Sequence, residues 1–186
     1  MTRAQLEHLI GAAATIADDH EVVIIGSQSI LGQFPDAPAE LCRSMEADLW
    51  PKNHPERWEL IDGSIGELSP FHEAFGYYAQ GVGPETATLP DGWQERVVRV
   101  ESPRTRGAVG LCLEIGDLLV SKYAAGRGKD REFVRTAVRL RLLDRDTLTK
   151  RIATTHLDHH RRAVILGLVE RDFRDCAVDP RQVLIP

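Results

Sequence analysis

The sequence predicts an α+β fold, with a mixed β-sheet flanked by helices in residues 1–115 and a helical C-terminal region, 116–186, packed on that sheet domain. Residues 22–25 form a run that is apolar on both faces, which is typical of a central strand covered from both sides. Residues 44–50 alternate between polar and apolar side chains and predict a second strand. Beyond Gly116 the apolar spacing becomes helical and remains so, which completes the α+β pattern.

The first elements follow from apolar spacing and from breaking residues. Residues 3–18 carry apolar side chains at helical spacing and predict an amphipathic helix before the central strand. Gly26 permits a tight turn after that strand, and residues 27–31 begin a second helix. Residues 33–40 contain two prolines and predict a loop that leads into the second strand. Residues 51–66 are polar and interrupted by prolines.

The later elements are predicted from caps and turns. Ser69 can cap a helix with Pro70 in its first turn, so a helix is expected over residues 68–80. Residues 86–89 and 96–100 are predicted as two strands joined by a turn. Further along, the pattern predicts one short strand, 109–115, and four helices, 117–125, 129–143, 146–154 and 158–174.

Composition restricts the class of protein. The 186 residues suit one domain, or one domain with a small extension. No window is long and apolar enough to cross a membrane, and the first residues lack the apolar core of a secretory signal. The cysteines are odd in number and far apart, which indicates reduced thiols of a cytoplasmic protein rather than zinc ligands: Cys42, Cys112 and Cys176.

Charge is distributed unevenly along the chain. The formal net charge of −5 argues against a protein coated in nucleic acid. In residues 122–151, however, ten basic residues stand against four acidic ones, so this stretch carries +6 and the rest of the chain −11. Such asymmetry permits a local site for a polyanion on an acidic protein.

The turn after the central strand and the strand that follows carry the groups best suited to chemistry. Ser27 can direct its hydroxyl and amide hydrogens at an anion near a helix start. Ser44, Glu46 and Asp48 alternate, so in a strand they leave from one face. Two neighbouring carboxylates repel unless a cation lies between them. Oxygen ligands favour Mg²⁺ or Mn²⁺ as that cation. An exposed strand whose acidic residues only face water is the alternative.

This arrangement resembles the nucleotidyltransferase superfamily, whose signature is a Gly-Ser or Gly-Gly turn followed by an acid-x-acid strand. The matching residues are Gly26, Ser27, Glu46 and Asp48. The first acid is usually Asp, so Glu46 departs from the pattern by one methylene. A second stretch resembles AbiEii/MenT-like toxin nucleotidyltransferases and a related group of uncharacterised bacterial nucleotidyltransferases, through Asp117, Leu118, Lys122, Ala125, Arg127, Lys129, Asp130 and Phe133.

Helical geometry gives Asp130 a special place independently of the resemblance. On a helix starting near Lys129, Asp130 falls inside the apolar arc, where a carboxylate must be paired or bound. Lys122 is a partner for it or a ligand of triphosphate, and a salt bridge that only ties two helices together is the alternative. Residues Arg131, Arg135 and Arg139 are expected in an exposed line on the opposite face, as an RNA-binding row or simply as a solvated surface.

The resemblance implies roles for these residues. Gly26, Ser27 and Ser44 would belong to the nucleotide site, and Glu46 and Asp48 would hold Mg²⁺ or Mn²⁺ and act in catalysis. Lys122 would bind triphosphate and Asp130 would position acceptor or nucleotide. Members often have a third carboxylate on a later strand, for which Glu101 is the candidate by position. Basic residues would receive RNA through phosphate contacts: Arg127, Lys129, Arg131, Arg135 and Arg139.

Three functions follow as hypotheses. The first is an enzyme that transfers a nucleoside monophosphate from an NTP to RNA, such as tRNA, as a toxin controlled by a cognate antitoxin protein. The second keeps the fold without catalysis, as a binding or regulatory protein. The third transfers the nucleotide to a small molecule or to a protein hydroxyl.

Overall fold

The structure is a computed structural model and describes residues 1–177. It contains two compact units. The first holds Met1–Ala87 and Gly92–Glu114, and the second holds Thr88–Asp91 and the described residues from Ile115 to Ala177. Among the described residues, no helix is both long enough and apolar enough to cross a membrane.

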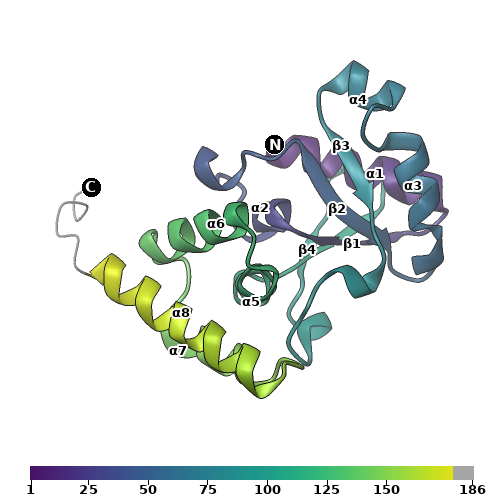
Figure 1. The fold of residues 1–186 in the computed structure, drawn as a ribbon. Coiled ribbons are helices and arrows are strands. Elements are labelled where there is room, and N and C mark those ends of the chain that lie inside the picture. The colour runs from purple at the N-terminus through teal and green to yellow at the C-terminus, as the bar shows by residue number, and fades with distance from the viewer. Residues whose placement is uncertain (178–186) are drawn as a thin grey trace. The chain divides into compact units, whose positions relative to one another are not determined.

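The first unit is a five-stranded sheet with helices against it (Figure 1). Its strands are β1 (Glu21–Ile25), β2 (Glu46–Pro51), β3 (Tyr78–Gly81), β4 (Val98–Val100) and β5 (Val109–Cys112). Its helices are α1 (Arg3–Ala17), α2 (Ile30–Gln33), α3 (Trp58–Ile65) and α4 (Pro70–Phe75). The strand order is β3-β2-β1-β5-β4, so β1 is central, as the apolar run 22–25 predicts.

Strand directions make the sheet mixed. β1 pairs with β2 antiparallel and with β5 parallel, β2 pairs with β3 parallel, and β4 pairs with β5 antiparallel. Ile24 lies opposite Leu49 on one side and Cys112 on the other. These three side chains are almost completely buried, so the central strand lies in the hydrophobic core of the first unit.

One face of the sheet, here called the helix face, is covered by α1. A Cβ added to Gly110 of β5 would lie 2.4 Å from Ile10 of α1, which shows how closely that helix approaches the strands. The ribbon view places α1 behind β2 and β3 (Figure 1). α1 itself begins with a capping box at Thr2 and buries Leu6, Leu9 and Ile10 completely. The predicted helix 3–18 is confirmed.

The second unit is helical: α5 (Ile115–Ala125), α6 (Gly128–Arg139), α7 (Arg145–Ala153) and α8 (His159–Ala177). A buried carboxylate, Asp172 of α8, joins three of these helices. It accepts a hydrogen bond from the Tyr123 hydroxyl of α5 at 3.0 Å and lies 3.7 Å from Arg131 and 3.9 Å from Arg135 of α6. The mixed sheet flanked by helices and the helical C-terminal half confirm the predicted α+β fold.

Two predicted segments are wrong, and one helix was not predicted. The helix expected over 68–80 stops at Phe75, because Gly76 adopts a left-handed conformation with φ 72°, and the chain then forms β3. Residues 86–89 form no strand; a 3-10 turn occupies Pro84–Thr86, and only β4 remains of that predicted pair. Residues 51–66, described only as polar, contain the helix α3.

Candidate functional site

The turn after β1 brings the backbone against a carboxylate. Gly26 has φ 67° and ψ −171°, a combination that residues with a side chain essentially never adopt. A Cβ at this position would lie 2.0 Å from Oδ2 of Asp48. The turn therefore needs glycine for its backbone angles and for the space that the Asp48 carboxylate occupies.

The strand register places the two acids side by side. Asp48 lies opposite Ile25, the last residue of β1, and Glu46 lies two residues before it on β2. Ala47 and Leu49 are buried towards the helix face, whereas Glu46 and Asp48 are half-buried and leave from the opposite face, here called the acidic face. The expectation that both acids share a face next to the Gly-Ser turn is met.

Tyr78 of β3 is a residue of this site that the sequence interpretation missed. It lies opposite Glu46 in the parallel register, and its hydroxyl donates a hydrogen bond to Glu46 Oε2 at 3.1 Å. Burial, together with that bond and the charge of Glu46, raises the pKa of Tyr78 to about 12. The phenol is therefore a permanent donor at neutral pH and fixes the direction of the Glu46 carboxylate.

Two further polar side chains hold the turn in shape. Ser29 is fully buried and donates from its hydroxyl to the Gly26 carbonyl at 2.9 Å. Gln28, also fully buried, donates to the Ser44 carbonyl at 3.3 Å and so ties the turn to the segment before β2. The half-exposed Ser27 hydroxyl has no hydrogen-bond partner within residues 1–177, and this leaves it available to a ligand.

Ser44 is not part of the strand, contrary to the alternation argument. β2 begins at Glu46, and the Ser44 hydroxyl accepts from the Glu46 amide at 3.0 Å and donates to the Glu46 carbonyl at 3.2 Å. These bonds commit the hydroxyl to shaping the start of β2. The structure thus gives Ser44 a local structural role beside the acids.

Glu101 lies at the wrong end of the sheet to complete the acidic pair. β4 runs opposite to β5, and Val100 is level with Gly110 and, through it, with Val22 near the start of β1. Asp48 is level with Ile25 at the other end. Glu101 is exposed and bonded to Arg99 at 3.0 Å. Its place on a later strand suggested Glu101 as a third carboxylate, but the observed register puts it at the opposite end of the sheet from Asp48.

Glu114 is the acid that the register places at the correct end. β5 runs parallel to β1, with Cys112 opposite Ile24, and the Leu113 amide donates to the Ile24 carbonyl at 3.2 Å. Glu114 follows directly, where the chain leaves the sheet level with Gly26. The sequence interpretation missed Glu114 because the predicted strand, 109–115, included it, whereas β5 ends three residues earlier, at Cys112.

In the second unit, Lys122, Arg127 and Asp130 form an ion cluster. Asp130 is fully buried, as its place in the apolar arc predicts, and it accepts from Lys122 Nζ at 2.9 Å and from Arg127 Nε at 2.6 Å. Burial alone would raise the pKa of Asp130, but the hydrogen bonds from Arg127 and Lys122 outweigh it and the pKa is lowered. Lys122 also lies 5.4 Å above the Phe133 ring. Asp130 is therefore paired within the helical unit, with Arg127 as a second partner beside Lys122.

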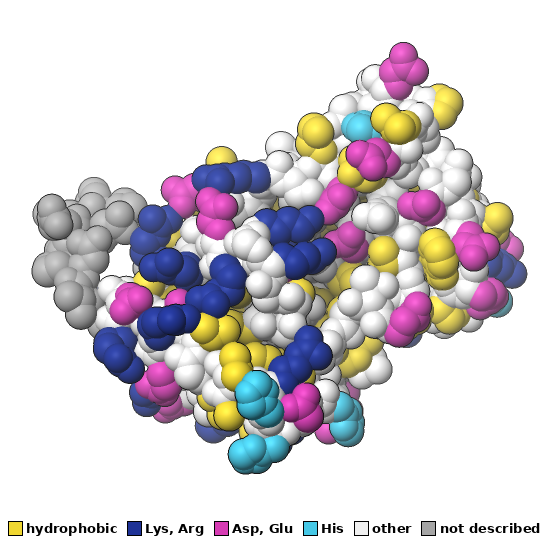
Figure 2. All heavy atoms as spheres, in the orientation of Figure 1, with side chains coloured by type: hydrophobic (Ala, Val, Ile, Leu, Met, Phe, Trp, Pro, Cys, Tyr) yellow, Lys and Arg dark blue, Asp and Glu magenta, His cyan; other side chains and the backbone are white. Residues whose placement is uncertain are grey.

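The expected row of exposed arginines is only partly found. The Arg131 side chain is 29% exposed and lies, with Arg135, beside Asp172 of α8. The Arg135 side chain is nevertheless 59% exposed, so of these two only Arg131 is largely covered by α8. Arg127, Lys129 and Arg139 are exposed, and Lys and Arg side chains gather over α6 and α8 in the space-filling view (Figure 2).

A divalent cation suits the acidic pair. Mg²⁺ is commonly held by one or two carboxylates together with substrate phosphates and water, rather than by a complete cage of protein ligands. Glu46 and Asp48 supply two such carboxylates on one face, and the described part of the chain contains no group of three or more His, Cys, Asp or Glu side chains arranged for a metal. The donor set fits a metal that arrives with a nucleotide.

Comparison with known proteins gives one finding at the level of a family. A family model described as "Nucleotidyltransferase of unknown function (DUF6036)" matches residues 4–169, which include both units. No curated protein and no solved structure gives a significant match.

Proposed function

The chain belongs to this family of nucleotidyltransferases, and on that premise we propose that it transfers a nucleoside monophosphate from an NTP to an acceptor and releases pyrophosphate. The observation that carries the proposal is the contact between the Gly26 turn and the Asp48 carboxylate, with Glu46 on the same face. A phosphate chain lying along the turn would have the two acids directly beside it.

Each residue of the site has a distinct task in this proposal. Glu46 and Asp48 would hold Mg²⁺ or Mn²⁺, which when bound neutralises phosphate charge and polarises the acceptor oxygen. The Ser27 hydroxyl donates to a phosphate oxygen. Tyr78 keeps the Glu46 carboxylate aimed, because its hydroxyl bonds Oε2. Glu114 replaces Glu101 as the candidate for a third carboxylate, here as a general base for the acceptor hydroxyl, since the described residues contain no group of three such ligands arranged for a metal.

Lys122 is proposed to bind triphosphate, with Asp130 as a positioning residue. A buried lysine loses most of its rotamer freedom when a carboxylate holds its ammonium group. Lys122 is 9% exposed in its side chain and is bonded to Asp130 at 2.9 Å, which supports a fixed ammonium group. Asp130 would act through Lys122 rather than touch the substrate.

RNA is the proposed acceptor, with a tRNA end as the first candidate, and the proposed biological role is that of a toxin restrained by a cognate antitoxin. The pattern from Asp117 to Phe133 supports the toxin role by resemblance alone. The acceptor is supported by charge as well: a cavity of about 360 Å³ on the helical unit is lined by Arg139, Arg141 and Arg145, with Asp144 as its one acidic residue. Guanidinium groups in such a place suit phosphate contacts.

The test is incubation of the whole chain with tRNA, each labelled NTP and Mg²⁺, followed by separation of labelled RNA. We expect label on RNA from the native chain and none from Asp48→Asn. Asp36→Asn, a change at an exposed loop residue, is the matched control and should remain active. If the label enters a small molecule or a protein instead, that molecule and not RNA is the acceptor. If the native chain transfers no nucleotide, and NTP still binds after both acids are replaced, the result would contradict the proposal of an enzyme and favour a regulatory protein.

A further inference from the structure

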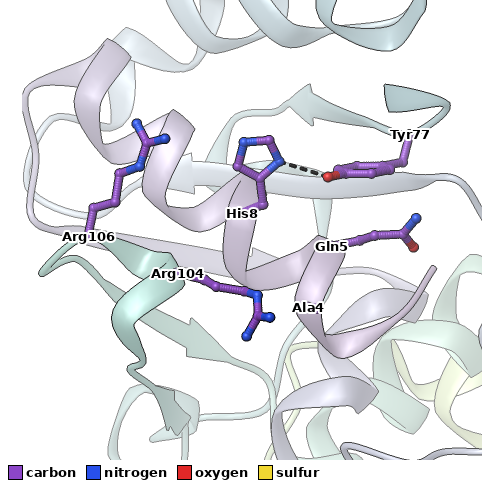
Figure 3. A pocket seen from close by; sticks show the side chains of 6 residues that line it. All are labelled: Ala4, Gln5, His8, Tyr77, Arg104 and Arg106. Atoms are coloured by element: carbon purple, nitrogen blue, oxygen red, sulfur yellow. Dashed lines mark hydrogen bonds between the residues drawn. The ribbon is translucent and has the colours of Figure 1, made fainter. Parts of the chain in front are cut away.

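A second cavity lies in the first unit, on the helix face of the sheet. It measures about 360 Å³ and is lined by Ala4, Gln5, His8, Tyr77, Arg104 and Arg106 (Figure 3). Three of these residues come from α1, which covers the face opposite to the acidic pair. Tyr77 directly precedes Tyr78, and the two tyrosines belong to different sites: Tyr78 donates a hydrogen bond to Glu46, whereas Tyr77 lines this cavity.

The two arginines of the cavity carry uncompensated charge. Arg104 and Arg106 lie on the turn around Pro103–Thr105, and neither side chain has a hydrogen bond or an ion pair within residues 1–177. No carboxylate lines the cavity. Both side chains are exposed, and Figure 3 shows their guanidinium groups on different sides of the cavity. Two guanidinium groups without a counter-ion create a positive potential around the cavity, and their N–H groups match the oxygens of phosphate in pairs.

His8 adds a donor to this lining. Its Nδ1 lies 2.7 Å from the Tyr77 hydroxyl. Burial, and then the charge of Arg106, lower the pKa of His8, while burial raises the pKa of Tyr77, so a neutral ring faces a protonated phenol. When the phenol donates to Nδ1, the ring proton resides on Nε2, which lies on the Arg106 side of the ring in Figure 3.

Gln5 contributes its amide hydrogens in the same way. Its Oε1 accepts from the Thr2 amide at 2.7 Å as part of the capping box at the start of α1. The oxygen is therefore engaged, and the NH₂ group remains for a ligand. The polar groups of the cavity are thus donors throughout, which selects an anion over a neutral or cationic ligand.

We propose that this cavity binds the phosphate group of a small phosphorylated molecule, with Arg104, Arg106 and His8 as its ligands. The Tyr77 ring forms an apolar wall for the group attached to the phosphate, and the rings of Phe71 and Phe75 surround His8 at centroid distances of 5.2 and 4.9 Å. A volume of about 360 Å³ lies in the range of small-molecule sites. The site is independent of the acidic pair, and the proposal does not rest on the proposed function.

The test titrates the whole chain, without divalent metal, with inorganic phosphate in one arm and a nucleoside 5′-monophosphate in the other. Calorimetry measures affinity, and NMR follows the His8 ring through a pH titration. Bound phosphate is expected to raise the pKa of His8, because the dianion stabilises the imidazolium. Tighter binding of the monophosphate would identify a nucleotide as the ligand, and equal affinity would identify phosphate itself.

The decisive variant is Arg104→Gln with Arg106→Asn, since asparagine tolerates the left-handed φ of 53° at position 106. We expect affinity to fall about tenfold or more for the loss of charged hydrogen bonds. Arg171→Gln with Arg174→Gln, at exposed positions of α8, removes the same charge and should leave affinity unchanged. Absence of binding in both arms, an unchanged pKa of His8, or equal loss in the two variants would overturn the proposal.

Discussion

Gly26 cannot accept a side chain, for two independent reasons. Its backbone angles, φ 67° and ψ −171°, are restricted to glycine, and the Asp48 carboxylate occupies the place of a Cβ. A sequence reader sees only that glycine ends a strand here. The close approach of Asp48 depends on the antiparallel register of β1 and β2, which local sequence does not contain.

Gly26→Ala is expected to remove transfer activity and to lower stability by about 1–3 kcal/mol, the range for a strained backbone. Urea unfolding and the RNA-labelling assay measure the two effects. Gly63→Ala is the matched control, because a Cβ at Gly63 meets nothing within 4 Å. It should retain activity and gain slightly in stability, since alanine favours the helix. Native activity in Gly26→Ala would contradict the assigned turn.

Tyr78 gives the site a pH signature in alkali. Because its folded pKa of about 12 exceeds the ordinary value of 10.0, the stability it contributes is complete below pH 10 and is lost as the pH rises towards 12. Tyr78→Phe removes this ionisation. The difference in unfolding free energy between native chain and variant should therefore shrink between pH 10 and pH 12. A difference that stays constant over that range would show that the phenol is not perturbed.

Among the elements, α4 and β3 show where sequence interpretation works and where it stops. Ser69 and Pro70 correctly predict the helix start, since a cap and a first-turn proline act locally. The strand after Gly76 is stabilised by pairing with β2, which is distant in sequence, so the local sequence does not predict it. Tyr78 was therefore assigned to a helix and its bond to Glu46 was missed. The acids and the glycine turn were found because they are adjacent in short, distinctive stretches.

The directions of β4 and β5 predict which later acid matters. Glu114→Gln is expected to reduce the rate of transfer by about tenfold or more, because an amide cannot take the proton from the acceptor hydroxyl as a general base. Glu101→Gln, the control at the far end of the sheet, should change it little. Steady-state kinetics at saturating Mg²⁺ compares them. Equal effects of the two substitutions would contradict the assignment by register.

The ion cluster between α5 and α6 predicts an asymmetry. Asp130→Asn leaves Lys122 buried without a counter-ion, so a loss of about 3–5 kcal/mol is expected. Lys122→Met leaves Asp130 paired with Arg127 and should cost much less stability, yet it should lose transfer activity and raise the KM for NTP. Urea unfolding and kinetics separate the two. Full activity in a folded Lys122→Met variant would show that the cluster only joins the helices and does not bind triphosphate.

At the scale of the whole molecule, the basic residues and the acids of the proposed metal site lie in different parts of the chain. The stretch 122–151 carries +6 in a chain whose net charge is −5, and Lys and Arg side chains gather over α6 and α8 (Figure 2). The acids of the proposed metal site lie in the other unit, on β2. An acidic chain with one basic region attracts a polyanion to that region without binding it everywhere.

RNA affinity should therefore depend on salt and on particular arginines. Each phosphate contact contributes a slope of about 0.7 in log affinity against log salt for single strands. Arg139→Gln is expected to reduce the slope by about that amount, whereas Lys52→Gln, in the sheet unit, should not. Filter binding over a salt series measures both. A flat salt response of the native chain would exclude an RNA acceptor.

The sheet's central position for β1 also bears on how the chain folds during synthesis. The antiparallel neighbour of β1 is β2, which emerges from the ribosome soon afterwards, whereas its parallel neighbour β5 comes much later. Loop closure over such a separation is costly and slow. The nascent chain can therefore join Gly26 to Asp48 early, and this half-built sheet must wait, with one edge of β1 unpaired, until Cys112 has been made.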